Sequence, residues 1–382
     1  MYHILVNRRT LVMCLLLICF SFIHAQTSFK LKYNNSTVYT GIEVGSKGVK
    51  MSMVEIGKNA QTNGAFNILK DTSINTDFIS FTPPTFSATL EGLYNLYMTA
   101  EKVYKIPNKK IFTMISSGVK MQAEKEEKTN WINNLIDSFK IKINEPDRPV
   151  IVIDVRQEAF LSHLGIVPEA RRYNTFLIDI GSGNTKGGYF PYGNTKEFYL
   201  FQLNWGTKST ANATDKMCGD EKSLPNFSKQ MSRVLAGAEN SEIIYAVNSS
   251  GAYPLSDYIA FSGGIAWAVA TLSHPELIDN SVIPVTFDEV IKFSEKIYSN
   301  YASYSETNLV NISSDESEKA AIRKAVKTVH GVFDQKSLMA GSGLLLKIMR
   351  QFVSIYETKQ FYLVKNGQVG WISAYVDQTI SK

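Results

Sequence analysis

The chain has 382 residues, of which 44% are hydrophobic and 20% are charged, and its formal net charge is +5. This length and apolar content predict about two packed domains. Positive and negative charges are thus nearly balanced. This argues against a nucleic-acid-binding surface, because basic residues usually cluster on such surfaces.

The first 25 residues predict a cleaved secretory signal. Two arginines precede an apolar run over residues 10–23, and Ala25 offers a small-residue cleavage site. Because this run is shorter than the roughly 20 residues of a spanning helix, we expect a secreted or periplasmic protein with no stable membrane span after cleavage. Cys218 is then the single thiol, which excludes an intramolecular disulfide framework and a multi-cysteine zinc site.

The first expected domain, residues 36–170, alternates strands with helices. Apolar stretches on both sides of Gly45 and Gly48 predict a tight hairpin over residues 38–56. The other elements expected in this half are strands over 65–69, 110–115 and 149–155 and helices over 90–104, 124–139 and 157–164.

The same order begins again after a polar boundary at residues 168–174, so a second domain is expected over 171–382. Its first elements are a hairpin over 175–180 and 186–192, a strand over 197–203 and a long helical region after Gly206. A strand over 258–261 and an apolar helix follow, then helices over 287–297 and 316–329, a strand over 361–364 and a C-terminal amphipathic stretch.

One motif occurs in both halves. In residues 42–50 and again in 178–186, an apolar strand delivers a carboxylate, a glycine-serine turn follows, and a lysine stands eight positions after the isoleucine. Glu43 thereby corresponds to Asp179, and Lys50 to Lys186. The repeat predicts a duplicated α/β protein with mixed sheets, whose ligand lies in the crevice beyond the strand ends.

Glycine turns of this kind expose consecutive main-chain N–H groups, which form an anion site without needing a side chain. Three loops qualify: Gly45-Ser46-Lys47-Gly48, Gly181-Ser182-Gly183-Asn184 and Ser262-Gly263-Gly264, the last at the start of a helix. One such loop is usually only a turn, whereas three in duplicated order favour a grip on a phosphate chain. The usual phosphate loop ending in Gly-Lys-Ser/Thr is absent.

This order of motifs resembles the actin-like ATPase superfamily, and within it the exopolyphosphatase and guanosine pentaphosphate phosphatase family, with the ecto-apyrases as close cousins. Five segments carry the resemblance. Residues 43–48 and 179–185 resemble the two phosphate loops, and 262–264 resemble a third glycine motif. Residues 116–120 correspond to the segment where these families have a phosphate-contacting arginine, and 157–165 to their Glu-Glu-Ala motif. The resemblance implies duplicated ribonuclease H-like (actin-like) domains with mixed five-stranded sheets around an interdomain cleft.

The resemblance also implies roles for residues. Glu158 would be the general base for an attacking water. Asp179, with Glu43 opposite, would hold Mg²⁺ or Ca²⁺, and Lys120 stands where these families carry their arginine. The phosphate-binding residues it implies are Gly45, Ser46, Lys47, Lys120, Gly181, Ser182, Gly183, Asn184, Thr185, Lys186, Gly263 and Gly264.

Each role has a structural alternative. Glu158 would also suit the first turn of any helix, where a carboxylate is favoured. Asp179 would serve equally as the cap of its own turn, and Lys120 as an exposed surface lysine.

Three positions depart from the family pattern. Glu43 replaces the usual aspartate, and Gln157 replaces the first glutamate of the Glu-Glu-Ala motif. Lys186 stands where the phosphatases carry glutamate and the apyrases glutamine, and a lysine there binds phosphate but repels a metal ion. These changes permit a weakened, metal-altered or inactive site.

The leading functional prediction is an extracytoplasmic hydrolase that removes the terminal phosphate of a small-molecule phosphoanhydride, either a nucleotide or inorganic polyphosphate. The alternative is a domain pair that closes on such a ligand without cleaving it. A third is an actin-like filament protein, although the sequence offers no identifiable interface and indicates no oligomeric state.

Overall fold

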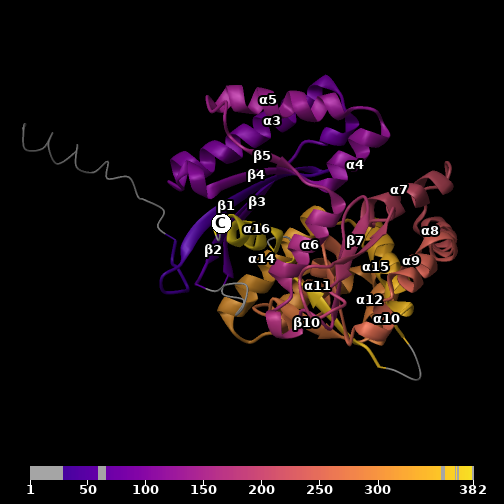
Figure 1. Cartoon of the computed structure of the whole chain (residues 1–382). Helices are drawn as coiled ribbons and strands as arrows, with labels where there is room; N and C mark the ends of the chain where they lie inside the picture. Colours follow the sequence, from indigo (N-terminus) through magenta and orange to yellow (C-terminus); the bar gives the residue numbers. More distant parts are fainter. Residues whose placement is uncertain (1–28, 59–65, 354–357, 366, 368–369, 381–382) are drawn as a thin grey trace, which may run out of the picture.

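The computed structural model describes residues 29–58, 66–353, 358–365, 367 and 370–380. The predicted signal segment, residues 1–25, lies outside the described residues. Two α/β domains stand one above the other, each built on its own sheet (Figure 1). Within the described ranges, no helix combines the length and apolarity needed to cross a membrane.

The first sheet has five strands in the spatial order β3-β2-β1-β4-β5. Its strands are β1 (Thr37–Val44), β2 (Gly48–Ile56), β3 (Phe66–Asn75), β4 (Ile111–Ile115) and β5 (Val150–Val152). The first three pair antiparallel, and β4 and β5 add parallel to β1. The sheet is therefore mixed, as predicted.

The second sheet has six strands in the order β10-β11-β9-β6-β7-β8. They are β6 (Thr175–Ile180), β7 (Thr185–Tyr189), β8 (Tyr199–Leu203), β9 (Tyr258–Ser262), β10 (Val282–Val285) and β11 (Gln360–Val364). Five of these strands, in the order β8-β7-β6-β9-β11, have the same arrangement and directions as β3-β2-β1-β4-β5 in the first sheet. The predicted duplication is confirmed, but the second sheet has a sixth strand, because β10 pairs antiparallel with β11 at the edge.

Helices cover both sheets. Those of the first half are α3 (Pro83–Met98), α4 (Ser117–Lys125), α5 (Thr129–Ile143) and α6 (Val155–Ile166). Those of the second half are α7 (Thr207–Met217), α8 (Leu224–Ala238), α9 (Ile244–Ser250), α10 (Ala252–Leu255), α11 (Gly264–Ser273), α12 (Phe287–Ser299), α13 (Glu306–Val310), α14 (Glu316–Val332), α15 (Gln335–Arg350) and α16 (Gly370–Ile380).

Some element boundaries differ from the sequence predictions for local reasons. The helix expected over 90–104 already begins at Pro83, because Thr82 forms a capping box and proline suits the first helical turn. The helix expected over 124–139 is two helices, α4 and α5, which a short connection at residues 126–128 separates. The third strand, expected over 65–69, runs on to Asn75.

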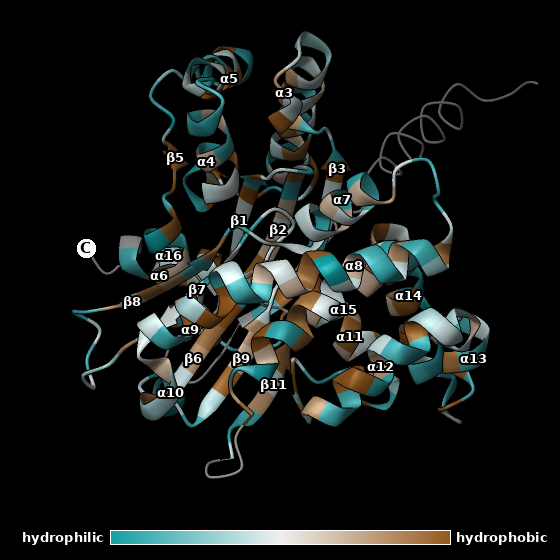
Figure 2. Cartoon of the chain, turned by 90° about the vertical axis from the view of Figure 1, so that its right-hand side faces the viewer, coloured by the Kyte–Doolittle hydropathy of each residue, from teal (hydrophilic) through white to brown (hydrophobic). Residues whose placement is uncertain are grey.

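Each domain has its own apolar core. Ile42, Val49 and Leu93 are fully buried in the first, and Phe176, Phe261 and others in the second. In Figure 2 the strands β6 and β9 are largely brown, whereas α5 and α8 carry teal on their outer surfaces. The near-continuous burial along β6 and β9 is typical of strands whose sheet is covered by helices on both faces.

The last helix of each half packs on the sheet of the other half. Helix α6 contacts the second domain, where Phe160 lies 5.5 Å from Phe190 between ring centroids. Helix α16 packs on the first sheet beside β1 (Figure 1), with Tyr375 at 5.5 Å from Phe112. The predicted boundary at residues 170/171 lies between the last strand of the first sheet and the first strand of the second, whereas α16 packs on the first sheet from the far end of the chain.

Where α6 crosses α16, the two backbones touch. A Cβ atom added at Gly165 would lie 1.7 Å from the carbonyl oxygen of Gly370. Only glycine permits so close an approach.

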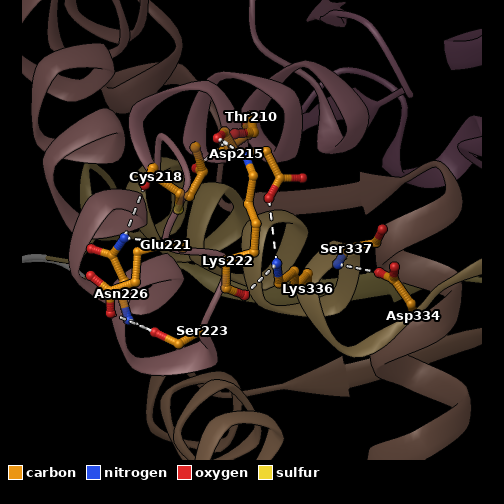
Figure 3. Close-up of polar contacts among 11 residues, drawn as sticks. Thr210, Asp215, Cys218, Glu221, Lys222, Ser223, Asn226, Asp334, Lys336 and Ser337 are labelled. Carbon is orange, nitrogen blue, oxygen red and sulfur yellow. Dashed lines mark hydrogen bonds and ion pairs between the residues drawn. The ribbon is translucent and has the colours of Figure 1, made fainter.

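Helix α7 is held against α15 by polar contacts (Figure 3). Lys336, near the start of α15, places its Nζ 3.5 Å from Oδ1 of Asp215 and donates to the carbonyl of Lys222 at 3.2 Å. Lys222 in turn donates to the carbonyl of Asp215 at 2.7 Å. These contacts position α7, whose first turn supports one of the glycine loops described below.

Candidate functional site

Both glycine turns are two-residue hairpin tips. In the first, Gly45 donates its N–H to the carbonyl of Gly48 at 2.8 Å, and Gly48 donates back at 3.2 Å. In the second, Gly181 donates to the carbonyl of Asn184 at 2.9 Å. The residues at the tips, 46–47 and 182–183, lie beyond these last rungs of the two ladders, where N–H groups are available to an anion.

The two tips lie close to each other although they belong to different domains. A Cβ atom added at Gly118 would be 3.3 Å from Oγ of Ser46 and 4.0 Å from Oδ1 of Asn184. Both turns line one cleft of about 520 Å³ between the domains. The sequence-derived expectation that the repeated turns face each other therefore agrees with the geometry.

The cleft contains most of the predicted site residues: Glu43, Gly45, Ser46, Lys47, Glu158, Asp179, Gly181, Ser182, Gly183, Asn184, Lys186, Gly263 and Gly264. Two others do not line it. Lys120 lies on α4 with its Nζ 3.9 Å from Glu124. Thr185 is buried, and its hydroxyl donates to the carbonyl of Trp205 at 2.7 Å. The structure gives these two residues local structural contacts.

The second turn is supported from behind by the start of α7. The N–H of Thr207 donates to the carbonyl of Gly181 at 2.9 Å, and that of Lys208 donates to the carbonyl of Ser182 at 2.7 Å. The first amides of a helix need acceptors, and here the loop supplies them. The turn is thus fixed by main-chain contacts.

The third loop joins β9 to α11. Gly263 has φ +93°, and a Cβ atom there would be 2.2 Å from the carbonyl oxygen of Ile180, so no other residue fits without strain. The preceding Ser262 donates its hydroxyl to Oδ1 of Asp179 at 3.0 Å. This loop therefore packs directly on the strand that carries the second carboxylate.

An ion-pair cluster of three side chains lines the cleft. The Nζ of Lys186 lies 3.0 Å from Oδ2 of Asp179 and 3.1 Å from Oε1 of Glu158. Lys186 is only 6% exposed. Asp179 and Lys186 face each other in register across the β6–β7 hairpin, whereas Glu158 reaches in from α6. One ammonium group thus joins carboxylates from both halves of the chain.

Glu158 is held on its other side by the start of α4. The N–H of Ser117 donates to Oε2 of Glu158 at 3.0 Å, while Asp154 caps α6 by accepting from Gln157. A carboxylate at a helix N-terminus is electrostatically favourable. Both oxygens of Glu158 therefore have donors, although each oxygen keeps a second lone pair.

Glu43 is the counterpart of Asp179 in the first half and faces Lys50 in register. Burial raises the pKa of Glu43 to about 7, and the nearby charge of Glu158 contributes in the same direction. Lys50, however, places its Nζ 3.5 Å from Asp71 on the neighbouring strand. The first hairpin thus repeats the acid and lysine of the second.

Lysine side chains and aromatic rings lie along the cleft or connect the two domains beside it. Lys47 lies over the ring of Phe333 at 5.6 Å, and Lys208 faces Asp77 at 3.9 Å, so both contacts bridge the two domains. Phe333 and Trp267 line the wall with ring centroids 6.5 Å apart. Such a wall offers an apolar face beside the phosphate turns.

Sequence reasoning missed some of these residues. Lys50 could have been included among the site residues, because the repeated hairpin places it opposite Glu43. No sequence pattern indicates that Asp71 lies beside Lys50. Phe333 follows α14 with no pattern that marks it. Among the described residues, no group of three or more His, Cys, Asp or Glu side chains has the arrangement of a metal site.

The fold is similar to that of known phosphatase structures. A Ppx/GppA family member from Aquifex aeolicus superposes with a TM-score of 0.57 at 15% identity, covering 90% of this chain and 99% of that one. An exopolyphosphatase-like protein gives 0.57 at 14% identity, covering 91% and 100%. An exopolyphosphatase from Cytophaga hutchinsonii gives 0.52 at 14% identity, covering 89% and 98%.

No family model and no curated protein matches the sequence itself. At such low identity the likeness concerns the fold, and at that level the predicted resemblance to the exopolyphosphatase and guanosine pentaphosphate phosphatase family is confirmed.

Proposed function

We propose that the protein binds a phosphoanhydride, either inorganic polyphosphate or a nucleoside polyphosphate, between its two glycine turns and hydrolyses the terminal anhydride. We further propose that it acts outside the cytoplasm, on the evidence of residues 1–25. The observation that carries the proposal is the meeting of two hairpin tips and the carboxylate of Glu158 in one interdomain cleft. The similar structures include an exopolyphosphatase-like protein and an exopolyphosphatase, which supports the choice of reaction.

In the proposed reaction, water attacks the terminal phosphorus while the bond from that phosphorus to the bridging oxygen breaks. The shortened nucleotide or polyphosphate chain departs with the bridging oxygen and the bonding electron pair, and the terminal group is released as inorganic phosphate. Glu158 orients the water and accepts its proton through a lone pair left by Lys186 and Ser117. The main-chain N–H groups of the turns, with the Lys186 ammonium, stabilise the negative charge on the phosphoryl oxygens.

The divalent cation implied by the resemblance meets an obstacle at Asp179. The Lys186 ammonium already contacts Asp179 and Glu158. A doubly charged ion about 4 Å from an ammonium is repelled by about 8 kcal/mol at an effective dielectric constant of about 20. In this arrangement the residues do not fit Mg²⁺ or Ca²⁺ at Asp179, so no step is assigned to a metal.

A second candidate function is binding without cleavage. It is favoured by the donors on both oxygens of Glu158, which hold the predicted base in place and compete with a water for its lone pairs. In this case the domains would close on a phosphorylated ligand and leave it intact.

Phosphate release separates the two functions. ATP, ADP, guanosine pentaphosphate and polyphosphate are each incubated with the protein, with Mg²⁺, with Ca²⁺ or with EDTA. If the protein is a hydrolase, the wild type releases phosphate, and Glu158→Gln lowers the rate of release by about 10²-fold or more. The variant should still be stabilised against heat by the ligand. Stabilisation by a substrate that stays intact establishes binding alone, and undiminished release by Glu158→Gln removes that residue from the base role.

A further inference from the structure

We propose that the ammonium group of Lys186 is the built-in cation of this cleft and takes the place of a divalent metal ion, so that phosphate groups bind without added metal. The inference rests on the proposed function, since it concerns the same phosphate-binding cleft.

The first argument is the position of the ammonium. Its nitrogen is within 3.1 Å of carboxylate oxygens from Asp179 and Glu158. Asp179 belongs to strand β6 of the second half, and Glu158 belongs to helix α6 of the first half. A divalent ion would need these same oxygens at about 2.0–2.6 Å. The lysine therefore occupies the point where the carboxylates of the cleft converge.

The second argument is that this cation is buried and held in place. Lys186 is 6% exposed, and its ammonium group contacts one carboxylate oxygen of Glu158 and one of Asp179. The side chain starts from the middle of a sheet, on β7 opposite Asp179. Its position is thus set by strand pairing, as a fixed cation requires.

The third argument is its proximity to the second turn. A Cβ atom at Gly181 would be 4.0 Å from the Lys186 nitrogen, so the ammonium lies beside the proposed phosphate groove. In the first half, the equivalent Lys50 instead contacts Asp71 at 3.5 Å. The ammonium of the second hairpin thus stands beside the second turn and between carboxylates of both halves.

Titration with Mn²⁺ alone tests the inference without any substrate. Free Mn²⁺ is followed by electron paramagnetic resonance for the wild type, Lys186→Gln and the charge-keeping control Lys186→Arg. We expect no saturable site in the wild type or Lys186→Arg. Lys186→Gln should show one saturable site, at least about ten-fold tighter than the residual, unsaturable binding to the wild type, and this site should be lost when Asp179→Asn is added. A saturable site in the wild type that Asp179→Asn abolishes would overturn the inference, even if Lys186→Gln does not fold.

Binding of inorganic tripolyphosphate gives a second readout. The wild-type melting temperature is expected to rise equally in EDTA and in Mg²⁺, whereas the rise for Lys186→Gln should be smaller in EDTA. A wild-type rise that occurs only with Mg²⁺ contradicts the inference. If tripolyphosphate has no effect in any condition, the proposed function fails, and the Mn²⁺ titration alone decides the place of Lys186.

Discussion

Replacing Glu43 with glutamine removes a carboxyl group whose pKa burial raises to about 7, from an ordinary value of 4.5. An acid with a raised pKa contributes stability that is fully present below its unfolded pKa and is lost as the pH rises through its folded pKa. The relevant window is therefore pH 4.5 to about 7. Glutamine stays neutral throughout and has nearly the same shape, so it reports on the charge alone.

The size of the effect follows from the two pKa values. Between pH 5 and pH 8, the free energy of unfolding of the wild type should fall by about 2.5 kcal/mol relative to that of Glu43→Gln. Urea denaturation of both proteins across this range measures the difference. Glu316→Gln, at a side chain that is 85% exposed, controls for the loss of one charge. A constant difference between wild type and Glu43→Gln would refute the burial and the close approach to Glu158 on which the reasoning rests.

Two further substitutions test the structure around and away from the cleft. Gly263→Ala should lower the free energy of unfolding by about 2 kcal/mol or more, because its φ is +93° and its Cβ would meet the Ile180 carbonyl; chemical denaturation showing wild-type stability would contradict this. Glu239→Ala should cost about 2 kcal/mol, because the buried carboxylate of Glu239 accepts from Lys347 and Arg350, and these two cations stay partly exposed to solvent without it. Since Glu239 does not line the cleft, tripolyphosphate binding at a temperature where the variant is folded should match the wild type, and a loss of binding there would tell against the separation of the two regions.

The duplicated hairpins were predictable because their signals are local. An apolar strand that ends in a glycine-serine turn and reverses is visible in residues 42–50 and 178–186, and strand pairing follows from that pattern. The edge strand β10 is only four residues long and contains Pro284, so it gives little alternation to detect. Helix α15 is absent from the predicted elements, because Gly341 and Gly343 weaken its helical pattern. In the structure both glycines are buried in the second domain.

The chemistry of the site depends on contacts that no local pattern encodes. The sequence predicts that Glu158, Asp179 and Lys186 belong to one site, but the position of the ammonium between the two carboxylates requires the packing of α6 against β7. Lys120 was expected at the cleft from its place in a motif, yet the turn of α4 puts its Nζ near Glu124. In both cases the direction of a helix decides which side chains meet.

The exchange of α6 and α16 between the two sheets has a consequence for how the chain is made. The first sheet is complete by Val152, but one of its faces is covered by α16, where Ile372 would touch a Cβ at Gly41. Helix α16 begins more than two hundred residues after the end of β5. The first sheet therefore keeps an apolar face uncovered until α16 has been synthesised, and a chain cut before Gly370 would lose the burial of that face.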